Sequence, residues 1–194
     1  MGNVKRLQMI TRNDSKFQEA RGLLQDFGID LVQARIERVE IQAEDVERVA
    51  VYSALEAAKH VEGPIIVEDD GLAIEALNGF PGPYSSFVFQ TLGLEGILRL
   101  MKGLQNRSAV FKSSLVFIEE ATGVPRIFTG VTAGFISEQV RGTRGFGYDP
   151  LFVPSEGDGR TFAEMTSEEK NLVSHRSKTM RAFGLWSQCQ GHFS

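Results

Sequence analysis

Cysteine and histidine are scarce in this sequence. Cys189 is the one cysteine among 194 residues, so no internal disulfide can form. Three histidines and no Cys-X-X-Cys pair exclude the usual structural zinc frameworks. A chain of this length buries roughly 70% of its unfolded surface on folding, so it needs neither kind of cross-link.

Long apolar runs are also missing. No stretch approaches the roughly 18 apolar residues of a membrane-spanning helix. The segment Met1–Arg6 lacks the apolar core that a secretory signal peptide needs. We therefore expect a soluble, cytoplasmic protein with no membrane partner.

Neither sign of charge dominates the chain. The 21 Lys and Arg residues face 25 Asp and Glu residues, and a net charge of −4 argues against a general nucleic-acid binder. The distribution is uneven, because the segment from Glu37 to Glu75 contains eleven acidic but only three basic residues. The acidic segment could hold cations, and the basic segment after Arg141 could hold anions.

The first part of the chain alternates strand and helix patterns. Leu7–Thr11 and Ile29–Ala34 predict short buried strands, separated by a helix that ends at Gly28. A second amphipathic helix is predicted from about Asp45 to His60, and the apolar run Ile65–Val67 predicts a third strand.

The later part of the chain adds a hairpin. A helix is predicted from about Ser85 to Met101, with interruptions near Gly93 and Gly96. Ala109–Ile118 and Arg126–Ile136 are rich in Val, Phe, Ile and Thr, and their short link predicts a long antiparallel hairpin. We expect one mixed α/β domain with a continuous core over the 194 residues.

A polar segment between the first strand and the first helix is the first candidate site. It consists of Thr11, Arg12, Asn13, Asp14, Ser15 and Lys16. Backbone N–H groups at a helix N-terminus bind phosphate, and Lys16 adds a mobile cation. The segment lacks the glycines and the Gly-Lys-Ser/Thr end of a Walker A loop. Alone it is weak, because most strand–turn–helix junctions bind nothing.

Three consecutive carboxylates follow the third predicted strand. Glu68, Asp69 and Asp70 precede Gly71 and repel one another unless something neutralises them. Extended backbone puts Glu68 and Asp70 on one side and Asp69 on the other, an arrangement that a turn at Gly71 would change. Together with Glu40 they suit Mg²⁺, which takes carboxylate oxygens, waters and phosphates. The alternative is an exposed acidic turn.

Glycines and aromatic residues alternate in Gly145-Phe146-Gly147-Tyr148-Asp149-Pro150. Aromatic rings stack on nucleobases, and a carboxylate accepts hydrogen bonds from a base. The alternative is a glycine-rich turn whose two aromatic side chains pack into the core.

The last candidate residues lie near the C-terminus. Thr166–Glu169 matches a capping box that starts a helix. In one continuous helix Lys170 and His175 would lie about 140° apart around the axis and could not face one ligand. A shared site requires a break near Val173, with Ser174 capping a new helix. Arg176 favours an oxygen-rich partner, although it could also be a surface charge.

Taken in order, these blocks resemble the inosine triphosphate pyrophosphatase family, also called Ham1-like or XTP/dITP diphosphatases. The resemblance runs from about Leu7 to Phe183 and is most specific in Gly145–Pro150 and Ser174–Arg176. It implies hydrolysis of unusual purine nucleoside triphosphates (ITP, dITP, XTP) to the monophosphate and pyrophosphate with Mg²⁺. It also implies an elongated mixed α/β fold, two lobes around a substrate cleft, and a homodimer.

The resemblance implies a role for each candidate residue. Asp69 is expected to activate water, and Glu40, Glu68 and Asp69 to hold Mg²⁺. Phe146 is expected to stack on the purine, with His175 and Arg176 as donors to its 6-oxo group. The full expected substrate-binding set is Thr11, Arg12, Asn13, Asp14, Ser15, Lys16, Asp70, Phe146, Gly147, Tyr148, Asp149, Lys170, His175 and Arg176.

Some positions depart from the family pattern. Arg12 stands where a small residue is common, Asp70 where a small polar residue is usual, and Lys59 lies two residues beyond a lysine that many members carry. No role is assigned to Lys59. Two alternatives stay open: a nucleotide sensor without catalytic activity, and a Maf-like pyrophosphatase acting on other modified nucleotides.

Overall fold

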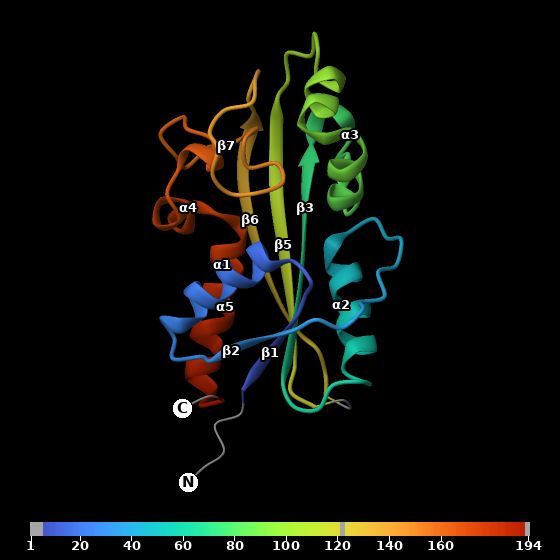
Figure 1. Cartoon of the computed structure of the whole chain (residues 1–194), viewed down its shortest axis with the longest axis vertical. Helices are drawn as coiled ribbons and strands as arrows, with labels where there is room; N and C mark the ends of the chain where they lie inside the picture. The colour runs from blue at the N-terminus through green and yellow to red at the C-terminus, as the bar shows by residue number, and fades with distance from the viewer. Residues whose placement is uncertain (1–5, 121–122, 193–194) are drawn as a thin grey trace. The chain divides into compact units, whose positions relative to one another are not determined.

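The computed structural model describes residues 6–120 and 123–192 (Figure 1). Residues 1–5, where no signal peptide is expected, residues 121–122 in the predicted hairpin link, and residues 193–194 lie outside the described part. The chain divides into two compact units. The first comprises residues 1–69, 113–130 and 176–194, and the second comprises residues 70–112 and 131–175. A single domain with one continuous core stays a prediction.

One mixed sheet contains the strands. The elements in chain order are β1 (Leu7–Ile10), α1 (Asp14–Gln25), β2 (Leu31–Ala34), α2 (Val46–Ala57), β3 (Ile65–Ile74), η1 (Glu75–Leu77), β4 (Pro81–Gly82), α3 (Ser85–Leu100), β5 (Ser108–Ile118), β6 (Arg126–Ile136), β7 (Phe152–Pro154), η2 (Phe162–Glu164), α4 (Ser167–Val173) and α5 (His175–Gln190). The sheet order is β2-β1-β3-β5-β6-β7, and β4 pairs with β3. Pairs β1–β2 and β1–β3 are parallel, whereas β3–β4 and β6–β7 are antiparallel. The predicted mixed α/β class is confirmed.

Alternating strand side chains build two hydrophobic clusters in the first unit. Ile66 and Phe117 pack with residues of α1 and α5, whereas Ile65, Val67 and Val116 pack with residues of α2. Successive side chains of a strand point to opposite faces of the sheet. The helices α1 and α5 therefore cover one face of this unit's strands and α2 covers the other (Figure 1).

Glycine 28 ends α1 as predicted. Its φ of 74° is a left-handed conformation that favours glycine. The N–H of Gly28 donates to the Gln25 carbonyl, and the N–H of Ile29 donates to the Leu24 carbonyl, the bond pair of a Schellman motif. The second predicted helix is α2, and it ends at Ala57, three residues before its predicted end.

The strand β3 is longer than predicted. It does not end at Val67 but continues through the three carboxylates to Ile74, with no turn at Gly71. Pairing with β4 explains the extension, because Leu72 lies opposite Gly82 and Ala73 opposite Pro81. The carboxylates thus sit in extended backbone, where neighbouring side chains face opposite sides.

The second unit has a hydrophobic cluster of its own. Residues of β3, α3, β5, β6 and the segment 148–165 form it, with Phe111, Phe152 and Phe162 in mutual ring contact. The helix α3 is interrupted at Gly93 (φ 64°, ψ −169°), as predicted, whereas the interruption predicted near Gly96 is wrong. Across the described residues, none of the helices has the length and apolar character needed to span a membrane.

Candidate active site

Ten of the predicted functional residues lie in two clusters of side chains, one in each unit. In the first unit, charged side chains meet in what we call the ionic cluster: Lys16, Glu19, Arg38, Glu40, Glu68, Asp69 and Arg176. In the second unit lies what we call the aromatic cluster: Asp70, Phe111, Phe146, Asp149, Phe162, Lys170 and His175. The division falls between the consecutive residues Asp69 and Asp70, and again between His175 and Arg176.

Glu68 is the most buried carboxylate of the ionic cluster. Its Oε1 accepts a hydrogen bond from Ser113 Oγ at 2.7 Å and lies 3.2 Å from Arg176 Nε. Its Oε2 lies 3.2 Å from Lys16 Nζ. The residue is 1% exposed, and a buried charge is stable only when it is paired and hydrogen-bonded.

Arg176 is also buried, at 1% exposure. Besides Glu68 in β3, it contacts Glu19 of α1, with 2.6 Å between Nη1 and Oε2. The guanidinium therefore joins α1, β3 and α5. This burial excludes the interpretation of Arg176 as a surface charge, while its contact with a purine base stays a prediction.

Removing the Arg176 guanidinium should destabilise the protein strongly. An Arg176→Met variant leaves Glu68 with one cation fewer in a buried site, which should lower the free energy of unfolding by about 3–5 kcal/mol. Urea denaturation measures this change. Arg181→Met, at an exposed position of the same helix, is the matched control and should change it little. Equal effects in the two variants would contradict the structural role.

The predicted phosphate segment is held by local hydrogen bonds. Asn13 is the N-cap of α1, since its side chain accepts from the Lys16 N–H at 3.0 Å. Thr11 Oγ1 accepts from the Asn13 N–H at 3.1 Å. Asp14 accepts from Gln33 Nε2 at 3.0 Å and also pairs with Arg35. Arg12 and Ser15 are exposed. The helix start is confirmed, and phosphate binding stays a prediction.

The Arg38 guanidinium contacts the residues that are predicted to bind the metal. Its Nη1 donates to the Glu68 backbone carbonyl at 3.1 Å. Its Nη2 contacts Glu40 Oε1 and lies 3.9 Å from Asp69 Oδ1. The carboxylates of Glu40 and Asp69 thus converge on one nitrogen of Arg38. Arg38 and Glu40 lie in the irregular segment between β2 and α2, whereas Asp69 lies in β3.

The trio of metal ligands Glu40, Glu68 and Asp69 stays a prediction. Within residues 6–120 and 123–192, no three Asp, Glu, His or Cys side chains are grouped as a metal site. The Glu68 carboxylate faces Lys16 and Arg176, because strand alternation turns it away from Asp69. Mg²⁺ is commonly held by one or two carboxylates plus waters and substrate phosphates. Glu40 and Asp69 fit that donor set, whereas the Glu68 carboxylate is paired with Lys16 and Arg176.

Lys170 and Asp149 form a buried ion pair in the aromatic cluster. Lys170 Nζ donates to Asp149 Oδ2 at 2.7 Å, and the same oxygen accepts from the Phe146 N–H at 2.9 Å. Lys170 Nζ also lies 5.0 Å from the Phe146 ring centre, within cation–π range. Gly145 is required here, because a Cβ would come within 2.0 Å of Asp149 Oδ2. These contacts fix the partly exposed Phe146 ring.

His175 is held between an aromatic ring and a carboxylate. Its ring stacks on Phe111, with 4.4 Å between centroids and 6° between planes. Its Nε2 lies 3.3 Å from Asp70 Oδ2, within hydrogen-bond distance. The predicted break is confirmed, since α4 ends at Val173 and α5 begins at His175.

Tyr148 belongs to the core. It is 4% exposed, and its hydroxyl donates to the Ser85 carbonyl at 3.0 Å. Burial raises the pKa of this phenol. These contacts fit the alternative of core packing, and a role of Tyr148 in the base pocket stays a prediction. Gly147 (φ 59°) lets the chain turn between the exposed and buried aromatic residues.

The start of α4 is fixed by Glu169, one residue before Lys170. Glu169 Oε2 accepts from the Thr166 N–H at 2.7 Å, which completes the predicted capping box. Arg160 donates to both oxygens of the same carboxylate, at 3.1 and 2.8 Å. The Arg160 hydrogen bonds, followed by the Thr166 N–H, lower the pKa of Glu169 from 4.5 to about 2.

Glu169→Gln should reveal this ion pair through pH. Glutamine preserves the capping acceptor but loses the charge. A lowered pKa contributes stability that is fully present above about pH 4.5 and disappears as the pH falls toward 2. The Tm of the variant should therefore lie slightly below that of the wild type at neutral pH, and the gap should close in acid. A gap that persists unchanged below pH 4 would refute the assignment.

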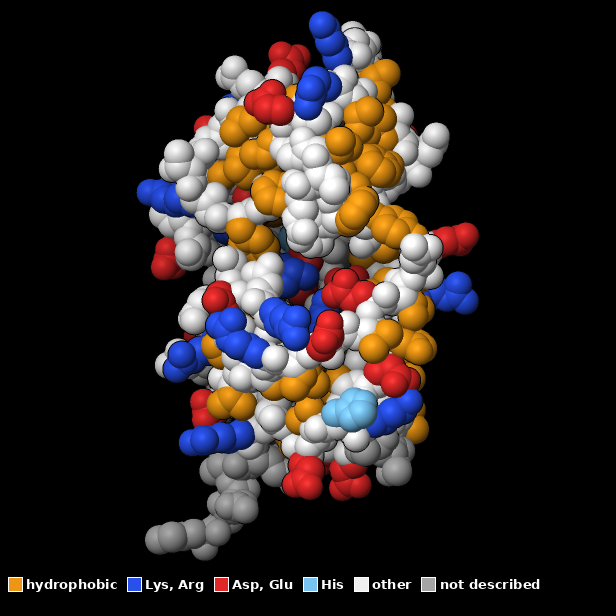
Figure 2. All heavy atoms as spheres, turned by 45° about the vertical axis from the view of Figure 1, so that its right-hand side comes forward, with side chains coloured by type: hydrophobic (Ala, Val, Ile, Leu, Met, Phe, Trp, Pro, Cys, Tyr) orange, Lys and Arg blue, Asp and Glu red, His pale blue; other side chains and the backbone are white. Residues whose placement is uncertain are grey.

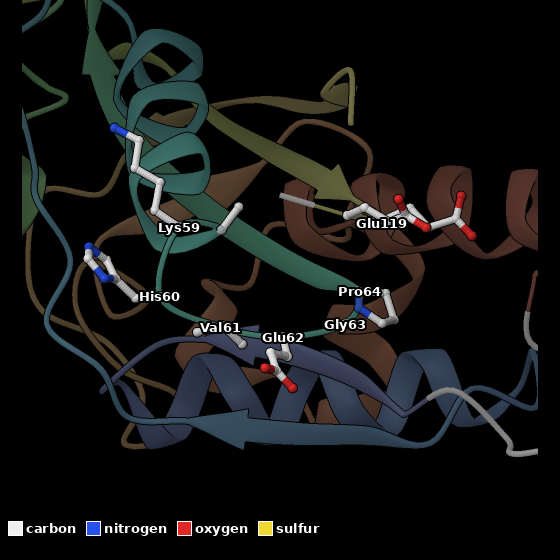
Figure 3. A pocket seen from close by; sticks show the side chains of 9 residues that line it. Lys59, His60, Val61, Glu62, Gly63, Pro64 and Glu119 are labelled. Carbon is white, nitrogen blue, oxygen red and sulfur yellow. The ribbon is translucent and has the colours of Figure 1, made fainter. Parts of the chain in front are cut away.

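A surface hollow of about 560 Å³ lies elsewhere in the first unit. Residues 58–64 line it together with Glu119 and Glu120, and no predicted site residue does. The Lys59 and His60 side chains point away from Glu119 (Figure 3). Lys59 Nζ instead donates to Glu56 at 2.5 Å. The hollow brings together no catalytic set.

Several residues of both clusters escaped the sequence analysis. Arg38 carried a signal, being one of three basic residues in the acidic segment and two positions before Glu40. Glu19 lies three residues after Lys16, on the same side of α1. The sequence gives no signal for Ser113 or Phe111, because only the tertiary fold brings Ser113 to Glu68 and Phe111 to His175.

Solved structures with this fold are known. The structure of a HAM1 protein from Coxiella burnetii is 31% identical, with a TM-score of 0.82 and coverage of 95% of this chain and 98% of that one. A nucleoside-triphosphatase / dITP/XTP pyrophosphatase from Mycobacterium abscessus is 32% identical, with a TM-score of 0.71 and coverage of 92% and 98%. The fold is thus that of a known class of enzymes, the dITP/XTP pyrophosphatases.

Sequence comparison places the chain within that class. Residues 7–186 match the model of the Ham1 family, so the chain belongs to this family. The dITP/XTP pyrophosphatase of Pyrococcus horikoshii is 51% identical over 91% of this chain and 94% of its own length. That of Thermococcus kodakarensis is 46% identical over 93% and 96%. The predicted family membership is confirmed.

Proposed function

We propose that this protein is a nucleoside triphosphate pyrophosphatase that converts dITP, ITP and XTP to the monophosphate and pyrophosphate. It would thereby remove these purine nucleotides from the cellular pool. The observation that carries the proposal is the convergence of Glu40 and Asp69 on one cationic position in the ionic cluster. The names of relatives with 42–51% identity support the substrate class and favour it over a Maf-like activity.

A divalent cation, Mg²⁺ in the first instance, is proposed to be held by Glu40 and Asp69. When bound, it would neutralise phosphate charge and lower the pKa of a coordinated water. Glu68 serves differently: it holds Lys16 and Arg176 in place from the interior. Lys16, at the N-terminus of α1, is then positioned beside backbone N–H groups that favour phosphate.

Asp69 is the proposed general base. A water attacks the α-phosphorus, Asp69 accepts its proton, and the bond from the α-phosphorus to the bridging oxygen breaks to release pyrophosphate. The segment Thr11–Lys16 stabilises the charge of the leaving group through N–H donors and Lys16. The Asp69 side chain is 13% exposed, so it retains access to water.

The purine is proposed to bind at the aromatic cluster. Phe146 offers a ring face held by Lys170, and His175 is oriented by Asp70 and Phe111. Hydrogen-bond donors at His175 and Lys170 suit a 6-oxo purine better than a 6-amino purine.

Asp69→Asn should nearly abolish turnover in a folded protein. The amide cannot accept the proton, and loss of a general base costs about 10²–10⁴-fold in rate. Pyrophosphate release from dITP with Mg²⁺ measures it, and circular dichroism confirms folding. Glu47→Gln, in the first turn of α2, is the control and should keep its rate. Release at the wild-type rate by Asp69→Asn would refute the assignment, and none from the wild type would favour the sensor alternative.

Phe146→Ala should raise KM for dITP more than it lowers kcat. A base stack is worth about 1–3 kcal/mol and acts in ground and transition states alike, so KM should rise about tenfold. Tyr148→Phe is the paired variant: it should lower Tm through the lost Ser85 hydrogen bond and leave KM near its original value. A lower Tm with unchanged KM for Phe146→Ala would instead assign its ring to the core.

We also propose a cytoplasmic homodimer, as the family resemblance implies. Exposed apolar side chains gather over α3 and the segment before it in the second unit, namely Phe80, Tyr84, Phe87, Leu92 and Leu100 (Figure 2). Phe87 is 67% exposed, an unusual position for an aromatic ring in a monomer. Analytical ultracentrifugation tests the oligomeric state.

A further inference from the structure

We propose that Arg38 is a resident counter-ion that occupies the cation position of the ionic cluster until a metal ion displaces it. The inference rests on the proposed metal-dependent function but concerns a residue to which that function assigns nothing. It makes metal binding and nucleotide binding interdependent.

The guanidinium is tied at two points. Nη1 donates to the Glu68 carbonyl at 3.1 Å, which is backbone of the central strand β3. Nη2 faces the carboxylates of Glu40 and Asp69. The first bond does not involve the metal carboxylates, so Arg38 can release Glu40 and remain attached to β3.

The segment that carries Arg38 is itself anchored. The buried Ser53 of α2 donates to the carbonyl of Val39 at 2.7 Å. This bond fixes the backbone between Arg38 and Glu40. The Arg38 side chain, which contacts both Glu40 and Asp69, therefore starts from a fixed backbone position. The Arg38 side chain is 15% exposed, which limits the water that could screen its charge.

Arginine stays protonated at every accessible pH, so its charge at this position is permanent. A divalent cation entering between Glu40 and Asp69 must break the ion pair and meet a like charge nearby. The free protein should therefore bind Mg²⁺ or Mn²⁺ weakly. A nucleotide triphosphate gives the displaced guanidinium new anionic partners, and metal affinity should rise with it.

The test is metal binding by the free protein, without substrate. In calorimetric titrations with Mn²⁺, Arg38→Gln should bind about fivefold to tenfold more tightly than the wild type, the effect of removing one partly screened charge. Arg38→Lys retains the charge and should stay close to the wild type. Arg48→Gln, at an exposed position of α2, makes the same change in net charge and should have no effect.

A second arm uses a non-hydrolysable triphosphate analogue. The analogue should raise the Mn²⁺ affinity of the wild type several-fold more than that of Arg38→Gln. Should Arg38→Gln fail to fold, Arg38→Met is measured in its place, with circular dichroism as the check on both.

The outcomes separate this inference from the proposed function. Unchanged or weaker Mn²⁺ binding by Arg38→Gln overturns the counter-ion role, even when the wild type releases pyrophosphate from dITP. Tighter binding by Arg38→Gln supports the role, even when the wild type shows no pyrophosphate release. Equal tightening by Arg48→Gln would overturn it as well, because the effect would then come from net charge.

Discussion

A carboxylate without solvent contact is the constraint on which the first unit depends. Glu68 sits inside the sheet, and an isolated charge there would destabilise the fold. Lys16, Ser113 and Arg176 compensate it from three different elements, α1, β5 and α5. The helix start before Lys16 and the helix start before Arg176 must therefore both be placed correctly relative to β3. The capping of α1 by Asn13 and the pairing of the buried Glu68 carboxylate thus favour the same placement of the helices relative to β3.

The two units carry different chemistry, and the chain keeps them separate by alternation. Asp69 and Asp70 are neighbours, yet Asp69 joins carboxylates and cations, while Asp70 orients an imidazole. His175 and Arg176 are divided in the same way. Helical and strand geometry send adjacent side chains in different directions, so two consecutive pairs of residues supply two clusters. The proposed division into phosphate and base recognition follows from that geometry.

Features set by a few neighbouring residues could be predicted from the sequence. The Gly28 helix end, the Gly93 interruption and the Thr166 capping box depend on local conformation, and all three are found. Extended backbone at residues 68–70 is also expected from the sequence, but the pairing of β3 with β4 could not be predicted, because it joins residues that η1 separates in the chain.

The metal ligands show a second limit. Strand alternation already separated Glu68 from Asp69, whereas the trio implied by family resemblance placed them together. The structure follows the periodicity argument, because the Glu68 carboxylate faces Lys16 and Arg176. Arg38 lies in an irregular segment with no periodicity to exploit. Only the fold shows that it reaches the carboxylates of Glu40 and Asp69.

Charge balance in the ionic cluster explains why metal and nucleotide should act together. The ion pairs described above join four carboxylates (Glu19, Glu40, Glu68, Asp69) to three cations (Lys16, Arg38, Arg176). A triphosphate with about four negative charges is repelled by such a cluster, and a metal ion alone must displace Arg38. When the metal ion and the nucleotide bind together, the charge of the metal offsets that of the carboxylates. The phosphates then accept hydrogen bonds from the displaced Arg38 guanidinium. We therefore propose that the complex of metal and nucleotide is the ligand that these residues favour over either component.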